Sequence, residues 1–170
     1  MKATRLIVVA LCVSLAACTD HTPTAAPQAP QADLVGSLVG STGLLKCSDL
    51  PAAQTTVMIG AQGGLISAGP HTLTIPAGAL SEPTSITMTL VTGRGVNGVK
   101  FEPEGLHFSR PATLSMDYAN CDLLGKVLPK RIAYTSNDLA IKYFLLSLDN
   151  ILAKRVTGQV YHFSDYVVAW

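Results

Sequence analysis

The chain has 170 residues, of which 48% are hydrophobic and only 14% are charged, with 12 Lys and Arg side chains set against 11 Asp and Glu, so we expect a single weakly charged domain. The basic residues form no cluster larger than the pairs Lys130-Arg131 and Lys154-Arg155, which excludes a basic stripe for a phosphate backbone and predicts no nucleic-acid partner. No apolar run reaches the roughly 18 to 20 residues of a membrane-spanning helix.

The first 18 residues have the pattern of an export signal that ends at a lipid attachment site. Lys2 and Arg5 form a short basic region, and residues 6–15 form an apolar stretch of secretory length. The stretch ends in the tetrapeptide Leu15-Ala16-Ala17-Cys18. This tetrapeptide resembles the lipobox of bacterial lipoproteins, in which the cysteine thiol receives a diacylglycerol and the cysteine becomes the acylated N-terminus.

The lipobox resemblance implies that residues 1–17 are a signal peptide and that a lipid on Cys18 holds the protein on a membrane. Thr19 follows where enteric lipoproteins of the inner membrane usually carry Asp, so the resemblance implies the outer membrane. The alternative is an ordinary signal peptide cleaved after Ala16 or Ala17.

The cysteine count predicts one disulfide. Of the four cysteines, Cys12 leaves with the signal peptide and Cys18 carries the lipid, so Cys47 and Cys121 remain as a pair in an oxidising, exported setting. A loop of about 75 residues closed by this bond would contribute about 4 kcal/mol in the chain-entropy model. Two free, buried thiols are the alternative.

Two segments of low complexity separate the lipidation site from the domain. Residues 18–33 contain three prolines and no aromatic residue, a composition that predicts a disordered tether. Residues 34–54 begin with the repeat Leu-Val-Gly-Ser, which places apolar pairs four residues apart. That spacing is helical, but glycine is a poor helix former. The segment is interpreted as an apolar strap packed on the domain, a self-associating helix or a disordered stretch.

From residue 55 to residue 170 the apolar pattern has a period of two, which is typical of half-buried strands. The apolar faces are Leu73 and Ile75, then Ile86, Met88 and Leu90, then Leu114, Met116 and Tyr118. Further runs are predicted at 131–135, 139–148, 151–157, 159–163 and 166–169, with turns at Asn137-Asp138, Asp149-Asn150 and Gly158. The sequence therefore predicts an all-β fold, an antiparallel β-sandwich.

The same region resembles the ZU-five domain, a module of zonula-occludens proteins, uncoordinated-five netrin receptors and ankyrins that also occurs in bacterial surface proteins. Four blocks carry the resemblance: Ile59-Gly60 with Gly63-Gly64; Leu73-Thr74-Ile75-Pro76-Ala77-Gly78-Ala79-Leu80 with Glu82-Pro83-Thr84; Pro103-Glu104-Gly105-Leu106 with Phe108 and Pro111; and His162-Phe163-Ser164 with Tyr166. It implies a sandwich whose relatives mostly bind other proteins and are not enzymes. We therefore expect a non-catalytic module of the cell envelope that binds an envelope protein or polymer or contributes to envelope structure.

Other chemical motifs give weaker signals. Residues 93–98 match the glycine pattern of a dinucleotide site, but residues 99–103 cannot open the helix that such a site needs, so the segment is interpreted as a flexible hairpin loop closed by Asn97-Gly98. Glu102 and Glu104 flank Pro103 and are interpreted as solvated charges and not as a catalytic pair. The four histidines have no ligand spacing. We expect no cofactor and no metal.

The ZU-five resemblance also implies one alternative function. In some animal relatives with the same three residues as His162-Phe163-Ser164, the chain cuts itself between Phe and Ser. In this acyl shift the Ser164 hydroxyl would attack the Phe163 carbonyl and replace the amide bond by an ester, His162 would help to take the proton or would orient the bond, and water would open the ester. A strained turn would drive the step. In the structural interpretation Phe163 fills the core while His162 and Ser164 hydrogen-bond across a corner. We expect an intact chain, because the sandwich would keep the predicted last strand.

Overall fold

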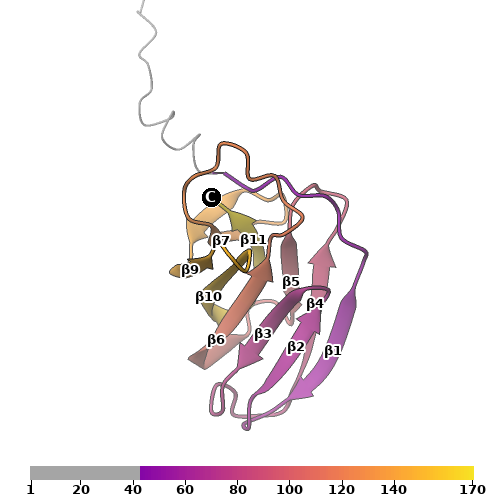
Figure 1. Cartoon of the computed structure of the whole chain (residues 1–170). Helices are drawn as coiled ribbons and strands as arrows, with labels where there is room; N and C mark the ends of the chain where they lie inside the picture. Colours follow the sequence, from indigo (N-terminus) through magenta and orange to yellow (C-terminus); the bar gives the residue numbers. More distant parts are fainter. Residues whose placement is uncertain (1–42) are drawn as a thin grey trace, which may run out of the picture. The chain divides into compact units, whose positions relative to one another are not determined.

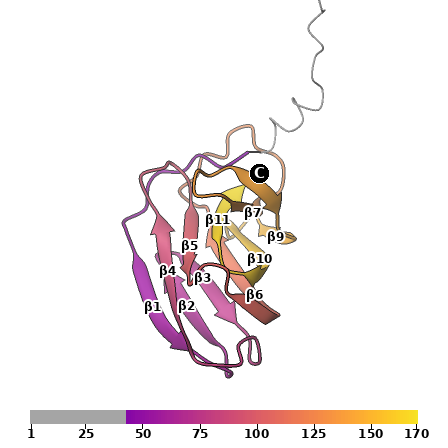
Figure 2. The ribbon, with the colours of Figure 1, turned by 180° about the vertical axis from the view of Figure 1, so that it is seen from behind.

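The computed structural model describes residues 43–170, which form two antiparallel β-sheets (Figure 1, Figure 2). The six-stranded sheet contains, in spatial order, β1 (Gln54–Ile59), β4 (Thr84–Val91), β5 (Gly98–Glu102), β11 (Asp165–Ala169), β7 (Arg131–Thr135) and β8 (Ile141–Phe144). The five-stranded sheet contains β2 (Gly64–Ala68), β3 (His71–Ile75), β6 (His107–Asp117), β10 (Arg155–His162) and β9 (Ser147–Asn150). The prediction of an all-β antiparallel sandwich is confirmed.

Several predictions concern residues outside this range. The signal peptide at 1–17, the lipidation site Cys18, the tether up to residue 33 and the Leu-Val-Gly-Ser repeat all lie outside the described residues. Within residues 43–170, no helix is long and apolar enough to cross a membrane.

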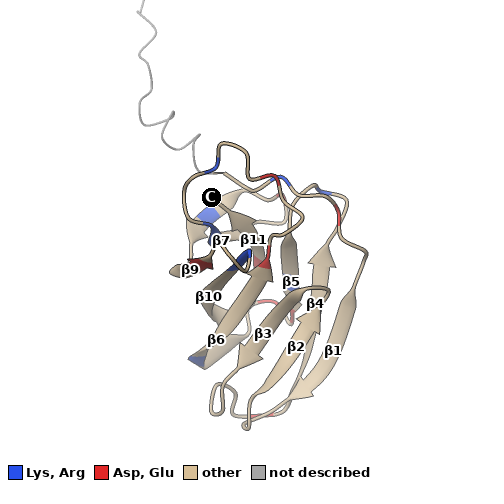
Figure 3. Ribbon diagram, in the orientation of Figure 1, with Lys and Arg blue, Asp and Glu red and all other residues tan. Residues whose placement is uncertain are grey.

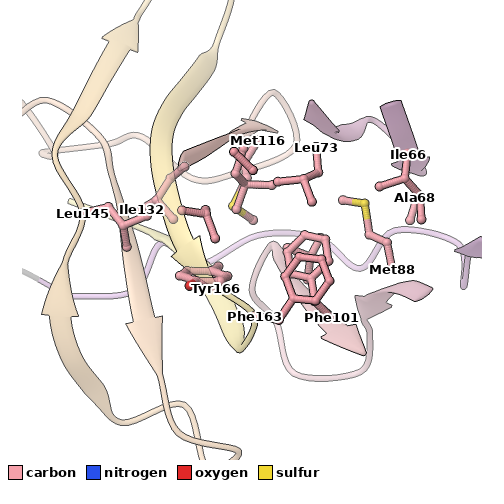
Figure 4. Packing of buried hydrophobic residues seen from close by; sticks show 14 of the residues in the cluster. Ile66, Ala68, Leu73, Met88, Phe101, Met116, Ile132, Leu145, Phe163 and Tyr166 are labelled. Carbon is pink, nitrogen blue, oxygen red and sulfur yellow. The ribbon is translucent and has the colours of Figure 1, made fainter. Parts of the chain in front are cut away.

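The hydrophobic core lies between the two sheets (Figure 4). The period-two pattern identified its strand faces correctly, because successive side chains of a strand point to opposite sides of the sheet. All eight residues predicted on those faces are buried: Leu73, Ile75, Ile86, Met88, Leu90, Leu114, Met116 and Tyr118. The alternating threonines and serines of β4 and β6 face outward.

One polar side chain, His71 at the start of β3, is fully buried. Its Nδ1 accepts a hydrogen bond from the backbone N–H of Asp117 at 3.1 Å, so the ring proton lies on Nε2. Nε2 is buried and has no hydrogen-bond partner within residues 43–170. Burial lowers the pKa of His71 to about 4, with Asp117 opposing the shift and Arg155 adding to it. His71 is therefore a neutral core residue.

The described part of the apolar strap packs on the domain in an extended form. The Leu45 N–H donates to the Val168 carbonyl at 3.1 Å, and the Trp170 N–H donates to the Gly43 carbonyl at 2.9 Å. The Leu45 side chain is completely buried. Residues 43–45 thus continue the six-stranded sheet beside the end of β11.

The predicted disulfide is confirmed. Cys47 and Cys121 are bonded across 74 positions of sequence, and the backbone N–H of Asp122 donates to the Lys46 carbonyl at 2.8 Å next to the bond. The bond ties the segment that enters the domain to the loop that follows β6.

The predicted run 139–148 is not one strand. It divides into β8, which pairs with β7, and β9, which pairs with β10 in the other sheet. Leu145 lies at the crossing: its N–H donates to the Ile132 carbonyl at 2.8 Å, and its side chain is buried in the core. A continuous apolar run hides such a change of sheet, because both strands need apolar residues.

Two turn predictions near β10 are wrong. Gly158 lies in the middle of β10, opposite Leu114 on one side and Ser147 on the other. A Cβ atom at this position would come 3.1 Å from the Ile132 side chain, so the glycine permits close packing of the sheets and makes no turn. Asp149 belongs to β9, where its carboxylate accepts hydrogen bonds from the Tyr118 hydroxyl and the Lys130 N–H.

Candidate functional site

The residues His162, Phe163 and Ser164 form the corner at which the chain passes from β10 to β11 and so from one sheet to the other. Phe163 is 1% exposed. Its ring stacks on the Phe101 ring (Figure 4). The two centroids are 4.8 Å apart, and the ring meets Phe108 edge-on with centroids 5.0 Å apart. The prediction that Phe163 fills the core is confirmed.

Backbone hydrogen bonds hold Phe163 through both its N–H group and its carbonyl group. Its N–H donates to the Leu106 carbonyl at 2.8 Å, and its carbonyl accepts from the Gly105 N–H at 3.1 Å. Gly105 has a φ of 77°, which lets the bend after β5 approach the corner. Among the non-glycine residues of 43–170, only Leu139 and Lys154 have a positive φ. The corner therefore has no left-handed strain at the bond that self-cleavage would break.

The side chains of His162 and Ser164 have different partners. His162 Nε2 lies 2.9 Å from the Tyr143 hydroxyl, and its Nδ1 lies 3.4 Å from the Phe163 carbonyl oxygen. A hydrogen bond from the buried Ser164 side chain, with the ammonium of Lys142 nearby, lowers the pKa of Tyr134. No hydrogen bond joins His162 to Ser164 in the described part of the chain. Tyr134 is therefore the titratable group whose pKa Ser164 affects, and no local sequence pattern indicates this pairing.

A second feature near this corner is an exposed apolar surface on β9, the residue before it, β10 and the turn between these two strands, which we call the β9 surface. Leu148 is 78% exposed on β9, the edge strand of its sheet. The other large apolar side chains of this surface are Leu146, Ile151, Leu152 and Tyr161, and they are 60% to 99% exposed. Exposed apolar patches are typical of interaction sites.

A small pocket of about 200 Å³ adjoins the β9 surface. Its lining includes Tyr143, Leu145, Leu146, Gln159 and Tyr161. The sequence does not indicate this surface, because residues 139–148 have the pattern of one half-buried strand. The alternation of Leu146 and Leu148 with Ser147 and Asp149 places the two leucines on one face, but by itself it predicts that this face is buried. Only the tertiary structure shows that the leucines point outward.

The structure places the two glutamates at the surface and the glycine-rich loop between β4 and β5. Glu102 and Glu104 are exposed and border an open depression of about 430 Å³ on the outer side of β4 and β5. The loop at 92–97 does join β4 to β5, but Asn97-Gly98 is not its turn. Asn97 is buried and donates through Nδ2 to the Asp117 carbonyl at 2.9 Å, and Gly98 begins β5. Within residues 43–170, no three His, Cys, Asp or Glu side chains gather closely enough to hold a metal ion.

No protein-family model matches the chain, and no curated protein matches it. The ZU-five resemblance therefore depends on the four sequence blocks, and membership of that family stays a prediction. Function has to be inferred from the residues themselves.

Proposed function

We propose that this protein is a lipid-anchored β-sandwich of the bacterial cell envelope that binds another envelope protein or polymer and catalyses no reaction. Three features support the proposal. The sequence ends its export signal in a lipobox at Cys18, the Cys47–Cys121 disulfide suits an oxidising compartment, and the domain presents the β9 surface. The resemblance to a family of binding modules agrees with it.

The observation that carries the binding proposal is the exposure of Leu146, Leu148 and Leu152, at 86%, 78% and 99%. Fully burying one such side chain against a partner contributes about 1.5 to 3 kcal/mol. A few side chains of this kind, next to a pocket that can receive one from the partner, are enough for a specific contact.

Photo-crosslinking from position 148 in cells tests this proposal. We expect crosslinks from position 148 to one defined envelope component and none from position 58, where Met58 is similarly exposed at 65% on the distant strand β1. The purified component should bind the purified protein, and Leu148→Asp should weaken that binding at least tenfold while Met58→Asp should not. Equal affinities of the two variants would refute the assignment of the surface.

Self-processing between Phe163 and Ser164 is the alternative function. The Tyr134 hydroxyl and the Lys142 ammonium, 3.3 Å apart, favour it, because a lowered pKa makes the Tyr134 phenolate more accessible, and the phenolate could accept the Ser164 proton. The lack of left-handed strain at the corner favours an intact chain. A denaturing mass spectrum should show one uncut mature species; a species ending at Phe163 that Ser164→Ala abolishes would establish the alternative.

A further inference from the structure

The loop between β6 and β7 carries two apolar side chains at its tip. Leu124 is 85% exposed and Val127 is 90% exposed. Gly125, with a φ of 69°, turns the chain between them. Neither side chain is part of the β9 surface.

The loop is held by its own hydrogen bonds. The side chain of Lys130 is only 6% exposed, and its ammonium donates to the carbonyls of Lys126 and Leu128 at 2.9 and 2.7 Å. The backbone N–H of Leu124 donates to the Asp122 carboxylate at 3.0 Å. A cation therefore lies inside the loop and apolar side chains lie outside, which is the reverse of the arrangement that water favours.

The loop lies at the end of the sandwich where the described chain begins (Figure 1). The Gly43 carbonyl accepts the Trp170 N–H, and the Lys126 ammonium lies 5.5 Å from the centroid of the Trp170 ring. About 24 residues separate Gly43 from Cys18, and they reach at most about 80 Å when fully extended. A lipid on Cys18 would hold the domain within that distance of the bilayer and would attach it through this end.

The groups around the tip match the chemistry of a membrane interface. Tryptophan and lysine are typical of the headgroup region, with apolar side chains below them. Lys126 stands over Trp170, and Lys46 is exposed beside the disulfide. Asp122 also lies at this end, but its carboxylate is hydrogen-bonded within the loop. Figure 3 shows both signs of charge in the loops at this end.

We propose that the loop 122–130 contacts the surface of the bilayer that carries the anchor, with Leu124 and Val127 inserted among the lipid headgroups. The proposal depends on the proposed lipid anchor. Leu124, Val127 and the less exposed Leu128 form too small a patch for a stable protein interface. A tethered domain needs only a weak contact, because its local concentration at the membrane is high.

The experiment uses the full mature chain in vesicles of phosphatidylethanolamine and phosphatidylglycerol, because Trp170 is the only tryptophan. A nitroxide lipid labelled near the headgroup should quench Trp170 emission. The double variant Leu124→Asp with Val127→Asp should reduce the quenching several-fold. The matched pair Met58→Asp with Leu65→Asp, which changes side chains that are 65% and 59% exposed on β1 and β2, should leave the quenching unchanged.

The loop proposal would be overturned if quenching were equally weak in the wild type and in the double variant of Leu124 and Val127. The same result is expected if another protein covers the loop in cells. Failure of the anchor is read separately, from the mass of the N-terminal peptide and from vesicle flotation. If Cys18 bears no lipid, coupling its free thiol to a maleimide lipid places the domain on the same vesicles. The quenching comparison then decides the loop contact by itself.

Discussion

The buried histidine of β3 makes a quantitative prediction about pH. In the unfolded chain His71 titrates near pH 6.5, whereas in the folded protein burial lowers its pKa to about 4. Protons therefore bind the unfolded state more readily between these two values. The stability that the neutral His71 provides is complete above about pH 6.5 and is lost as the pH falls towards 4.

The size of the effect follows from the two pKa values. We expect the free energy of unfolding to fall by about 2 kcal/mol between about pH 7.5 and pH 5, and by about 3 kcal/mol below pH 4, from this residue alone. Asp165 acts in the opposite direction, because burial raises the pKa of its carboxyl and acid relieves that cost. A comparison of variants is therefore needed to isolate His71.

Urea unfolding followed by Trp170 fluorescence, with the disulfide intact, measures this free energy. His71→Asn places a neutral acceptor near the position of Nδ1, so it should keep the hydrogen bond from the Asp117 N–H. We expect the variant to be less stable at neutral pH but to lose about 2 kcal/mol less than the wild type between about pH 7.5 and pH 5. An equal loss in both proteins would refute the buried neutral state.

Three further predictions concern the core, the disulfide and the anchor. Leu114→Ala should lower the free energy of unfolding by about 2 to 5 kcal/mol, because the side chain is completely buried; a change below about half a kcal/mol in urea would contradict that position. Reducing the Cys47–Cys121 bond should cost about 4 kcal/mol, and native unreduced protein should take up no alkylating reagent at either residue. Cys18→Ser should abolish lipid attachment, since the thiolate is the nucleophile; detergent partitioning with an acyl mass shift in this variant would disprove the lipobox, and fractionation of the wild type to the inner membrane would contradict the sorting prediction.

Local patterns determined the strand faces of this protein. Leu73, Ile86 and Leu114 could be assigned to the core from alternation alone, because the pleat of a strand sends neighbouring side chains to opposite sides. The Cys47–Cys121 bond followed from counting cysteines and not from any knowledge of distance. The structural interpretation of the His162-Phe163-Ser164 corner placed Phe163 in the core, where the structure has it.

Contacts between distant parts of the chain decided those features of the fold and of the site that local patterns do not show. The change of sheet at Leu145 and the place of Gly158 within β10 depend on which strands become neighbours, and a local period of two is the same in either sheet. For the same reason the sequence could not show that Ser164 meets Tyr134. Nor could it show that Lys126 lies over Trp170, since these side chains are 44 positions apart and only the closed sandwich brings them together.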